Sequence, residues 1–324
     1  MSEGNAVSVR AGQKVFRRLI FFLFACYVVA YLDRVNIGFA ALSMNKDLGL
    51  TAAMFGLANT IFYIGYFVCE VPSNLLMVRV GARLWIARIM VTWGIASILT
   101  LFAVGPLSLY AIRLVVGIAE AGFVPGVLLY LTYWFPQSSR GRATATFMIA
   151  QPIAIGFGSF LSGLIMSGTD RAFGLAGWQW LFILEGLPSV LLGVLVLFYL
   201  PDRPADAKWL NADEKAALQA QIAAEAPAPV HGHSNWRGVW SLPLGLLMLA
   251  YFGLVTSLNG LATWSPLIVR EVLGGTTYIF RVGLISAIPG VIAAIVMPLW
   301  GTSSDRRQER KLHYAIAVAV AIAG

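Results

Sequence analysis

The chain consists of long apolar runs separated by short polar segments. Eight runs hold about 20 or more mostly apolar residues, the length that an α-helix needs to cross a bilayer. They lie near residues 17–40, 53–77, 84–104, 107–134, 143–168, 178–200, 241–269 and 278–300. Because the runs are continuous rather than alternating, they predict an all-α membrane protein and exclude a β-barrel.

A ninth apolar run begins at about residue 312 and reads LHYAIAVAVAIAG. At about 1.5 Å per residue it would reach only about 20 Å into a hydrocarbon core of about 30 Å. We therefore expect about nine spans, with the last one cut short and the C-terminal part of the fold incomplete.

The longest polar stretch, residues 201–240, separates six runs from the rest. Within it, residues 211–222 predict a short amphipathic helix that begins at Asn211 as its N-cap, with Glu214 three residues later. We expect three parts: an N-terminal six-helix transmembrane bundle over 1–200, a cytoplasmic central loop over 201–240 and a partial C-terminal transmembrane bundle over 241–324.

The composition agrees with a membrane protein. Hydrophobic residues make up 59% of the 324 residues and charged residues only 12%, and the mean hydropathy is +0.77. A water-soluble domain of this size could not bury so much apolar surface behind so few charges. The two cysteines, Cys26 and Cys69, lie inside apolar runs, so neither a disulfide framework nor a cysteine metal site is expected.

The net charge of +8 is explained by membrane topology. If the N-terminus is cytoplasmic, 17 of the 23 Lys and Arg residues fall in segments on the cytoplasmic side. This distribution follows the positive-inside rule, which sets the orientation of membrane helices. The basic excess therefore predicts a cytoplasmic N-terminus rather than a nucleic-acid partner.

Four charged side chains lie inside the predicted spans, where each is expensive to insert. Asp33 and Arg34 are adjacent in the first span, and Arg113 and Glu120 lie seven residues apart in the fourth, on one helix face. One interpretation is two structural ion pairs. The other is a cationic site for an anionic substrate, with carboxyl groups that carry protons, since arginine can bind a carboxylate through two parallel hydrogen bonds.

Two further carboxyl groups, Glu70 and Glu185, lie closer to the ends of predicted spans. We interpret both as interface or structural carboxylates.

Several motifs occur together over most of residues 14–210. They read YLDRVNIGFA, CEVPSN, RVGARLWIARIM, EAGFVPG, YLTYWFP and LPDRPADAKWL. In this combination the sequence resembles the major facilitator superfamily, specifically its anion:cation symporter branch and the tartrate-transporter-like members beside phthalate, galactonate and hydroxyphenylacetate permeases. The resemblance implies import of a small organic anion with protons, by alternating access between two six-helix bundles.

The resemblance also implies roles for individual residues. Arg34 corresponds to the residue that binds the substrate anion, and Tyr31, Tyr66 and Gln151 to positions that line the substrate cavity. The proton-coupling positions are Asp33 and Glu120, with Arg113 as the fourth-span arginine that is linked to Glu120.

Two short loops correspond to the superfamily's gating motif. The first keeps Arg79, Gly81 and Arg83 but has Val78 where an acidic residue is usual, which implies a weaker clamp. The second, six spans later, keeps Gly301, Asp305 and Arg306.

We therefore expect a monomeric secondary transporter of the bacterial inner membrane that imports a tartrate-like dicarboxylate or sugar acid by proton symport, with no metal or cofactor. One alternative is an exchanger for an aromatic acid such as phthalate or hydroxyphenylacetate. Another is a non-transporting fragment, or a membrane sensor or assembly partner. A membrane-embedded enzyme is disfavoured, because histidine occurs only at 231, 233 and 313 and no HExxH or GxSxG element exists.

Overall fold

A computed structural model describes residues 3–225, 241–275 and 278–323. Within these ranges the secondary structure is entirely helical. The α-helices are α1 (Glu3–Val15), α2 (Phe21–Asp47), α3 (Ala52–Val80), α4 (Ala82–Ile98), α5 (Pro106–Glu120), α6 (Phe123–Trp134), α7 (Gln137–Met148), α8 (Ala150–Gly168), α9 (Gly177–Tyr199), α10 (Ala212–Ala224), α11 (Leu242–Val272), α12 (Ile279–Arg307) and α13 (Lys311–Ala323). The other elements are the π-helical turn η1 (Phe16–Ile20) and the short 3₁₀ turns η2 (Leu99–Phe102), η3 (Ala172–Gly174) and η4 (Pro204–Asp206).

Eight helical stretches of the described chain are long and apolar enough to cross a membrane. They coincide with the eight runs predicted from the sequence, so the prediction of an all-α membrane fold is confirmed. The ninth run forms the shorter apolar helix α13.

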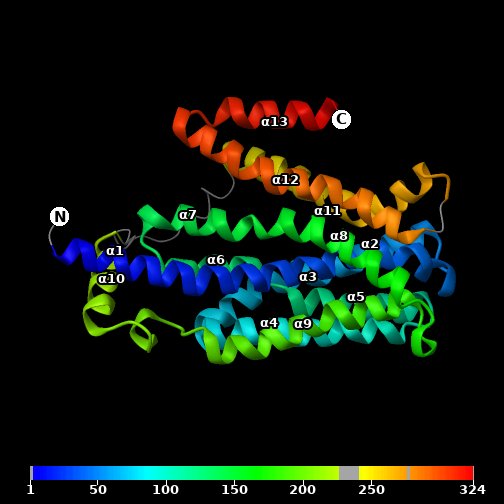
Figure 1. Ribbon diagram of the computed structural model, residues 1–324, viewed down its shortest axis with the longest axis horizontal. Helices are drawn as coiled ribbons and strands as arrows, with labels where there is room; N and C mark the ends of the chain where they lie inside the picture. Colours follow the sequence, from blue (N-terminus) through cyan, green and yellow to red (C-terminus); the bar gives the residue numbers. More distant parts are fainter. Residues whose placement is uncertain (1–2, 226–240, 276–277, 324) are drawn as a thin grey trace.

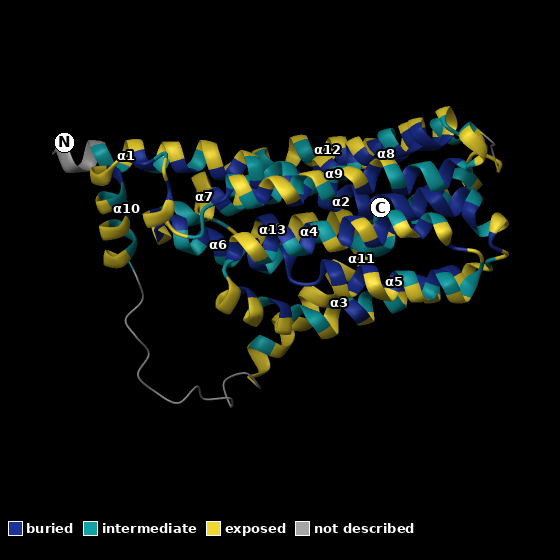
Figure 2. Ribbon diagram, turned by 90° about the horizontal axis from the view of Figure 1, so that it is seen from below, coloured by how far each residue is buried: buried dark blue, intermediate teal, exposed yellow. Residues whose placement is uncertain are grey.

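The elements α2 to α9 form a bundle of six spans (Figures 1 and 2). Large aromatic side chains fill much of its core. Trp93, Phe123 and Phe147 are fully or almost fully buried in it. Large apolar side chains on the outer surface, such as Phe67 and Phe198, are about four-fifths exposed, at 78% and 82%. Such a surface is favourable against lipid, because contact of large apolar side chains with water costs free energy and contact with lipid chains does not.

Helices α11, α12 and α13 lie along one side of this bundle (Figure 1). Helix α12 packs against α8 through glycines, and a Cβ atom added to Gly163 would lie 2.9 Å from the Cα of Gly283. Helix α11 packs against α2, where the Arg270 Nη1 donates to the Leu42 carbonyl oxygen at 2.8 Å. Small residues allow this close backbone approach between membrane helices.

The described part of the central loop, 201–225, is docked on the bundle. Helix α10 begins at Asn211, whose side chain accepts a hydrogen bond from the Glu214 N–H, while the Glu214 carboxylate accepts from the Asn211 N–H. The predicted capping box and short helix are thus confirmed. Lys14 of α1 lies 2.5 Å from Glu214, so α10 is held against α1. Residues 226–240, with His231 and His233, lie outside the described residues.

Candidate functional site

An ion pair between Arg34 of α2 and Glu120 of α5 lies inside the six-span bundle. The Arg34 Nε and Nη2 lie 2.7 and 2.6 Å from the same oxygen, Glu120 Oε1. The Glu120 side chain is 5% exposed and the Arg34 side chain 18%. Arg34 therefore keeps some access to the space beside α2, and Glu120 has almost none.

A helix break places Glu120 at this position. Glu120 is the last residue of α5, and α6 begins at Phe123 after Gly122, which adopts a positive φ of 90°. The Ser73 hydroxyl donates to the freed Ala121 carbonyl oxygen at 2.7 Å. The span predicted over 107–134 is confirmed as Pro106–Trp134. The hydropathy is high on both sides of the break, so the apolar pattern alone does not reveal it.

Arg113 lies on the same side of α5 as Glu120 but has a different partner. Its Nη2 is 3.5 Å from the Asn59 Oδ1, and its Cζ lies 4.5 Å from the centre of the Phe62 ring. The hydrogen bond to Glu120 comes from Arg34, so a linkage of Arg113 with Glu120, which the family resemblance implied, would act through their charges rather than through a direct hydrogen bond. Arg113 is 5% exposed and so is not available to a substrate in this conformation.

Asp33 faces away from the ion pair, toward α4. Its Oδ2 accepts from the Trp93 Nε1 at 2.7 Å, and its Oδ1 accepts from the Asn36 Nδ2 at 3.0 Å and from the Ser97 hydroxyl. Three neutral donors hold this buried carboxyl group. Of these donors only Asn36 belongs to the motif that contains Asp33, so Trp93 and Ser97 could be found only from the tertiary structure.

Two tyrosine rings lie close to the guanidinium group of Arg34. Its Cζ lies 5.0 Å from the ring centre of Tyr66 and 5.8 Å from that of Tyr31. The Gln151 Nε2 donates to the Tyr31 hydroxyl at 2.7 Å, which joins α8 to α2. The structure thus brings all four of the residues expected to bind substrate into one place: Arg34, Tyr31, Tyr66 and Gln151.

Glu185 was expected near a span end, and its position corrects that expectation. It lies in the interior of α9 and is 1% exposed. The Ser162 hydroxyl of α8 donates to its Oε1 at 2.9 Å. Glu70, by contrast, is only half-buried in α3.

The loop between α3 and α4, which the sequence predicted to be a gating loop, contacts a carboxylate from another part of the chain. The Arg83 N–H donates to the Asp202 Oδ1 at 2.9 Å, and the Arg83 Nε lies 3.8 Å from the Asp202 Oδ2. Asp202 follows α9, so the acid that is absent at Val78 is supplied by another segment. A Cβ atom at Gly81, where φ is 101°, would lie 3.0 Å from Asp202, so only glycine fits both the backbone and the approach of the carboxylate.

The residues of the second predicted gating loop, Asp305 and Arg306, lie in the last turn of α12. Arg79, of the first loop, likewise lies in the last turn of α3. Asp305 pairs weakly with Arg310, at 4.0 Å, on the exposed surface. Gly301 has open space where a side chain would be.

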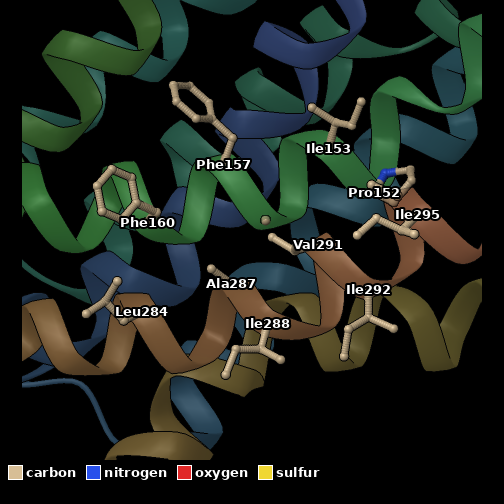
Figure 3. Close-up of a pocket in the computed structure, with 12 residues that line it drawn as sticks. Pro152, Ile153, Phe157, Phe160, Leu284, Ala287, Ile288, Val291, Ile292 and Ile295 are labelled. Atoms are coloured by element: carbon tan, nitrogen blue, oxygen red, sulfur yellow. The ribbon is translucent and has the colours of Figure 1, made fainter.

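An apolar groove of about 590 Å³ lies between α8 and α12 (Figure 3). Its lining includes Ile153 and Phe157 of α8 and Ile288 and Ile292 of α12, and none of the lining side chains is charged. Such a groove suits alkyl chains and offers an anion no partner. Among the described residues, no group of three or more His, Cys, Asp or Glu side chains is placed to hold a metal ion.

Comparisons with known proteins identify the family. Residues 23–324 match the model of the Major Facilitator Superfamily. The chain is 46% identical over 319 residues to a protein of Agrobacterium vitis named "Putative tartrate transporter", covering 98% of this chain and 73% of that protein. It is also 46% identical over 304 residues to the "Putative metabolite transport protein NicT" of Pseudomonas putida, covering 94% of this chain and 69% of that protein.

The fold agrees with solved transporter structures. A bacterial homologue of the human lysosomal transporter Spinster, in an inward-facing and occupied conformation, superposes with a TM-score of 0.66 at 19% identity. The match covers 89% of this chain, which spans 61% of the length of that structure. The family and its named members are transporters rather than enzymes. The chain is therefore a multi-pass membrane protein that belongs to the Major Facilitator Superfamily.

Proposed function

We propose that this protein is a secondary transporter that imports a small organic anion together with protons. The observation that carries the proposal is the ion pair between Arg34 and Glu120, which lies inside an apolar bundle with one edge of Arg34 exposed beside Tyr66 and Tyr31. A substrate carboxylate would compete with Glu120 for the guanidinium group, because both bind its donors in the same geometry.

This competition supplies the coupling between substrate and proton. A buried carboxylate that loses its arginine partner has no other cation to compensate its negative charge, so it takes up a proton. Binding of an anion at Arg34 then favours protonation of Glu120, and release of the anion lets the Arg34–Glu120 pair form again. Proton and anion move together because each favours binding of the other.

The relatives' names support the substrate class. Tartrate is a small hydroxylated dicarboxylate, and Arg34, the tyrosine hydroxyls and the Gln151 amide offer one charge and several neutral hydrogen-bonding groups. We accordingly propose a tartrate-like acid or sugar acid as the transported anion. The anion would be oriented by Tyr31, Tyr66 and Gln151. Proton coupling would also involve Asp33 and Arg113, which are buried and do not contact the anion.

Further parts of the proposal concern the setting of the molecule. We propose the bacterial inner membrane, a cytoplasmic N-terminus and a monomer that alternates between inward and outward access, with residues 1–200 and 241–324 as parts of two bundles and 201–240 between them. The loops around Gly81 and Asp305 would act at the cytoplasmic gate, with H⁺ as the coupling ion and no cofactor.

Uptake of radiolabelled tartrate into proteoliposomes tests the proposal. When the outside of the vesicles is made more acidic than the inside, the reconstituted chain should accumulate tartrate. The Glu120→Gln variant should take up tartrate at a rate that does not depend on this proton gradient. The alternative of anion exchange would show itself as uptake that requires anion inside the vesicles and ignores the pH gradient. That result would contradict proton symport.

A further inference from the structure

Three of the sequence motifs meet at one buried point next to Glu120. Ser73 belongs to CEVPSN in α3, Trp85 to RVGARLWIARIM in α4 and Ala121 to EAGFVPG at the end of α5. The Trp85 Nε1 donates to the Ser73 hydroxyl at 3.0 Å, and this hydroxyl donates to the Ala121 carbonyl oxygen at 2.7 Å. Ser73 and Ala121 are both buried, at 5% and 0% exposure. A single buried hydroxyl group therefore joins three spans.

The Ala121 carbonyl cannot be satisfied by the backbone of a continuing helix. Its donor would be the N–H four residues later, and that residue is Pro125, which has none. The Ala121 N–H still donates to the Gly117 carbonyl oxygen at 3.2 Å, but the chain then leaves the helix, with a ψ of 129° at Ala121. Because a buried carbonyl without a donor costs free energy, Ser73 supplies a hydrogen bond that this span cannot make for itself.

Glycines bring α3 close to the break. At Gly122, where φ is 90°, a Cβ atom would lie 2.5 Å from the Ser73 Oγ and 2.8 Å from the Ser73 Cβ. One turn earlier, a Cβ atom at Gly117 would clash with the Phe62 carbonyl oxygen of α3. Helices α3 and α5 thus pack backbone to backbone, and Ser73 extends their contact past the end of α5.

Glu120 depends on this backbone contact because few side chains hold its carboxylate. Its Oε1 pairs with Arg34, whereas its Oε2 is buried and has no hydrogen-bond partner among the described residues. The nearest polar partner of Arg113 is Asn59, and Asp33 accepts from neutral donors of α2 and α4. The position of the Glu120 carboxylate relative to Arg34 is therefore set mainly by the backbone at the end of α5.

We propose that Ser73 is a positioning residue of the anion site: it fixes the backbone beside Glu120 so that the carboxylate competes with the substrate anion for Arg34. This inference rests on the proposed function, in which the anion binds Arg34 only when it displaces Glu120. Without the Ser73 hydroxyl the break after α5 can relax, and the pair of Arg34 with Glu120 weakens. The anion then binds more easily, but its binding is less tightly linked to protonation of Glu120.

Tartrate binding and tartrate accumulation should consequently respond in opposite directions. Calorimetric titration of Ser73→Ala in detergent should give a Kd about fivefold lower than that of the wild type, the effect of about one hydrogen bond. Accumulation in proteoliposomes driven by a pH gradient should fall by about the same factor. A role of Ser73 in stability alone would weaken binding and accumulation together, and that result would overturn the proposal.

Thr60→Val is the matched control, because Thr60 lies in the same helix and its hydroxyl donates only to the Gly56 carbonyl oxygen of α3. Both its affinity and its accumulation should equal those of the wild type. If Ser73→Ala does not remain folded, Ser73→Cys takes its place, since it keeps the size of the side chain and has a weaker donor. The same opposite changes are expected for it.

A double-mutant cycle tests the link to Glu120 without any substrate. If Ser73 acts by placing the Glu120 carboxylate, its hydroxyl matters less once that carboxylate is absent. The loss of melting temperature in the double variant Ser73→Ala with Glu120→Gln should therefore be smaller than the sum of the two single losses. The losses of Thr60→Val and Glu120→Gln should be additive.

Additive losses for Ser73→Ala and Glu120→Gln would show that Ser73 does not act through Glu120. If the wild-type chain neither binds nor accumulates tartrate, the proposed function fails, and the cycle still decides whether Ser73 places Glu120.

Discussion

At the scale of single residues, the pairing of Arg34 with Glu120 is expected to affect stability and, under the proposed function, binding of the anion. An ion pair in a buried site is strongly destabilised when one partner alone is removed, because the other charge stays behind without compensation. The two residues lie 86 positions apart in the sequence, on different helices. Their contact is therefore also a link between α2 and α5.

This arrangement predicts that a second substitution can restore the stability that Arg34→Ala loses without restoring the binding. Arg34→Ala should weaken tartrate binding by about a hundredfold or more, since close charge pairs contribute about 2–5 kcal/mol, and it should lower the melting temperature. Adding Glu120→Gln should restore much of the melting temperature but none of the binding. Calorimetric titration and thermal unfolding measure the two quantities.

Arg17→Ala serves as the control for this prediction, because Arg17 is exposed in η1 and lies outside the anion site. Retained tartrate affinity in Arg34→Ala would contradict the assignment of the anion site.

At the scale of helices, α10 depends on a surface ion pair with α1. The hydrogen bond from Lys14 lowers the pKa of Glu214 from its usual 4.5. A carboxyl group with a lowered pKa in the folded state stabilises that state above its unfolded pKa and loses this effect as the pH falls through the folded value. The docking of α10 should therefore be intact at neutral pH and weaken below about pH 4.5.

Hydrogen exchange of residues 212–224 measures this docking. Glu214→Gln keeps the capping geometry but not the charge. Its protection factors, which correct the exchange rates for the intrinsic effect of pH, should therefore be lower than those of the wild type at neutral pH and should change little on acidification. Asp213→Asn, in the same turn, should behave like the wild type. Equal exchange of the wild type and Glu214→Gln at neutral pH would show that the ion pair does not hold α10.

The contact between α8 and α12 depends on glycine at defined positions. Gly163→Ala should destabilise the protein by about 1–3 kcal/mol, since the new methyl group would overpack a close backbone contact. Gly168→Ala in the same helix should have little effect, because nothing lies within 4 Å of its added Cβ. Denaturant titration in detergent measures the free energy of unfolding of both variants. Equal effects would show that the interface between α8 and α12 can accommodate the added methyl group.

At the scale of the whole molecule, the basic loops predict the orientation in the membrane. In a background of Cys26→Ala and Cys69→Ala, a membrane-impermeant maleimide should label Phe173→Cys from outside intact cells. Gln137→Cys should react only after the membrane is permeabilised. Both positions are exposed and lie at opposite ends of the span formed by α7 and α8. The reverse pattern would place the N-terminus outside.

Much of the architecture follows from the sequence alone. Runs of about 20 apolar residues must form helices in a bilayer, because no water is present there to satisfy backbone groups. The eight spans, the cap of α10 at Asn211 and the family could therefore be identified from local patterns and motifs. The motifs also singled out Arg34, Tyr31, Tyr66 and Gln151, which the structure brings together.

Only the tertiary structure decided which of the buried charges are partners. The sequence placed Arg113 and Glu120 on one helix face, yet Glu120 contacts Arg34, and Asp33 turns to Trp93 and Ser97. The break at Gly122, the carboxylate that Asp202 brings to Gly81 and the burial of Glu185 were likewise decided by tertiary packing. Hydropathy is a property of neighbouring residues, whereas a salt bridge depends on angstrom-scale distances between helices that are far apart in the chain.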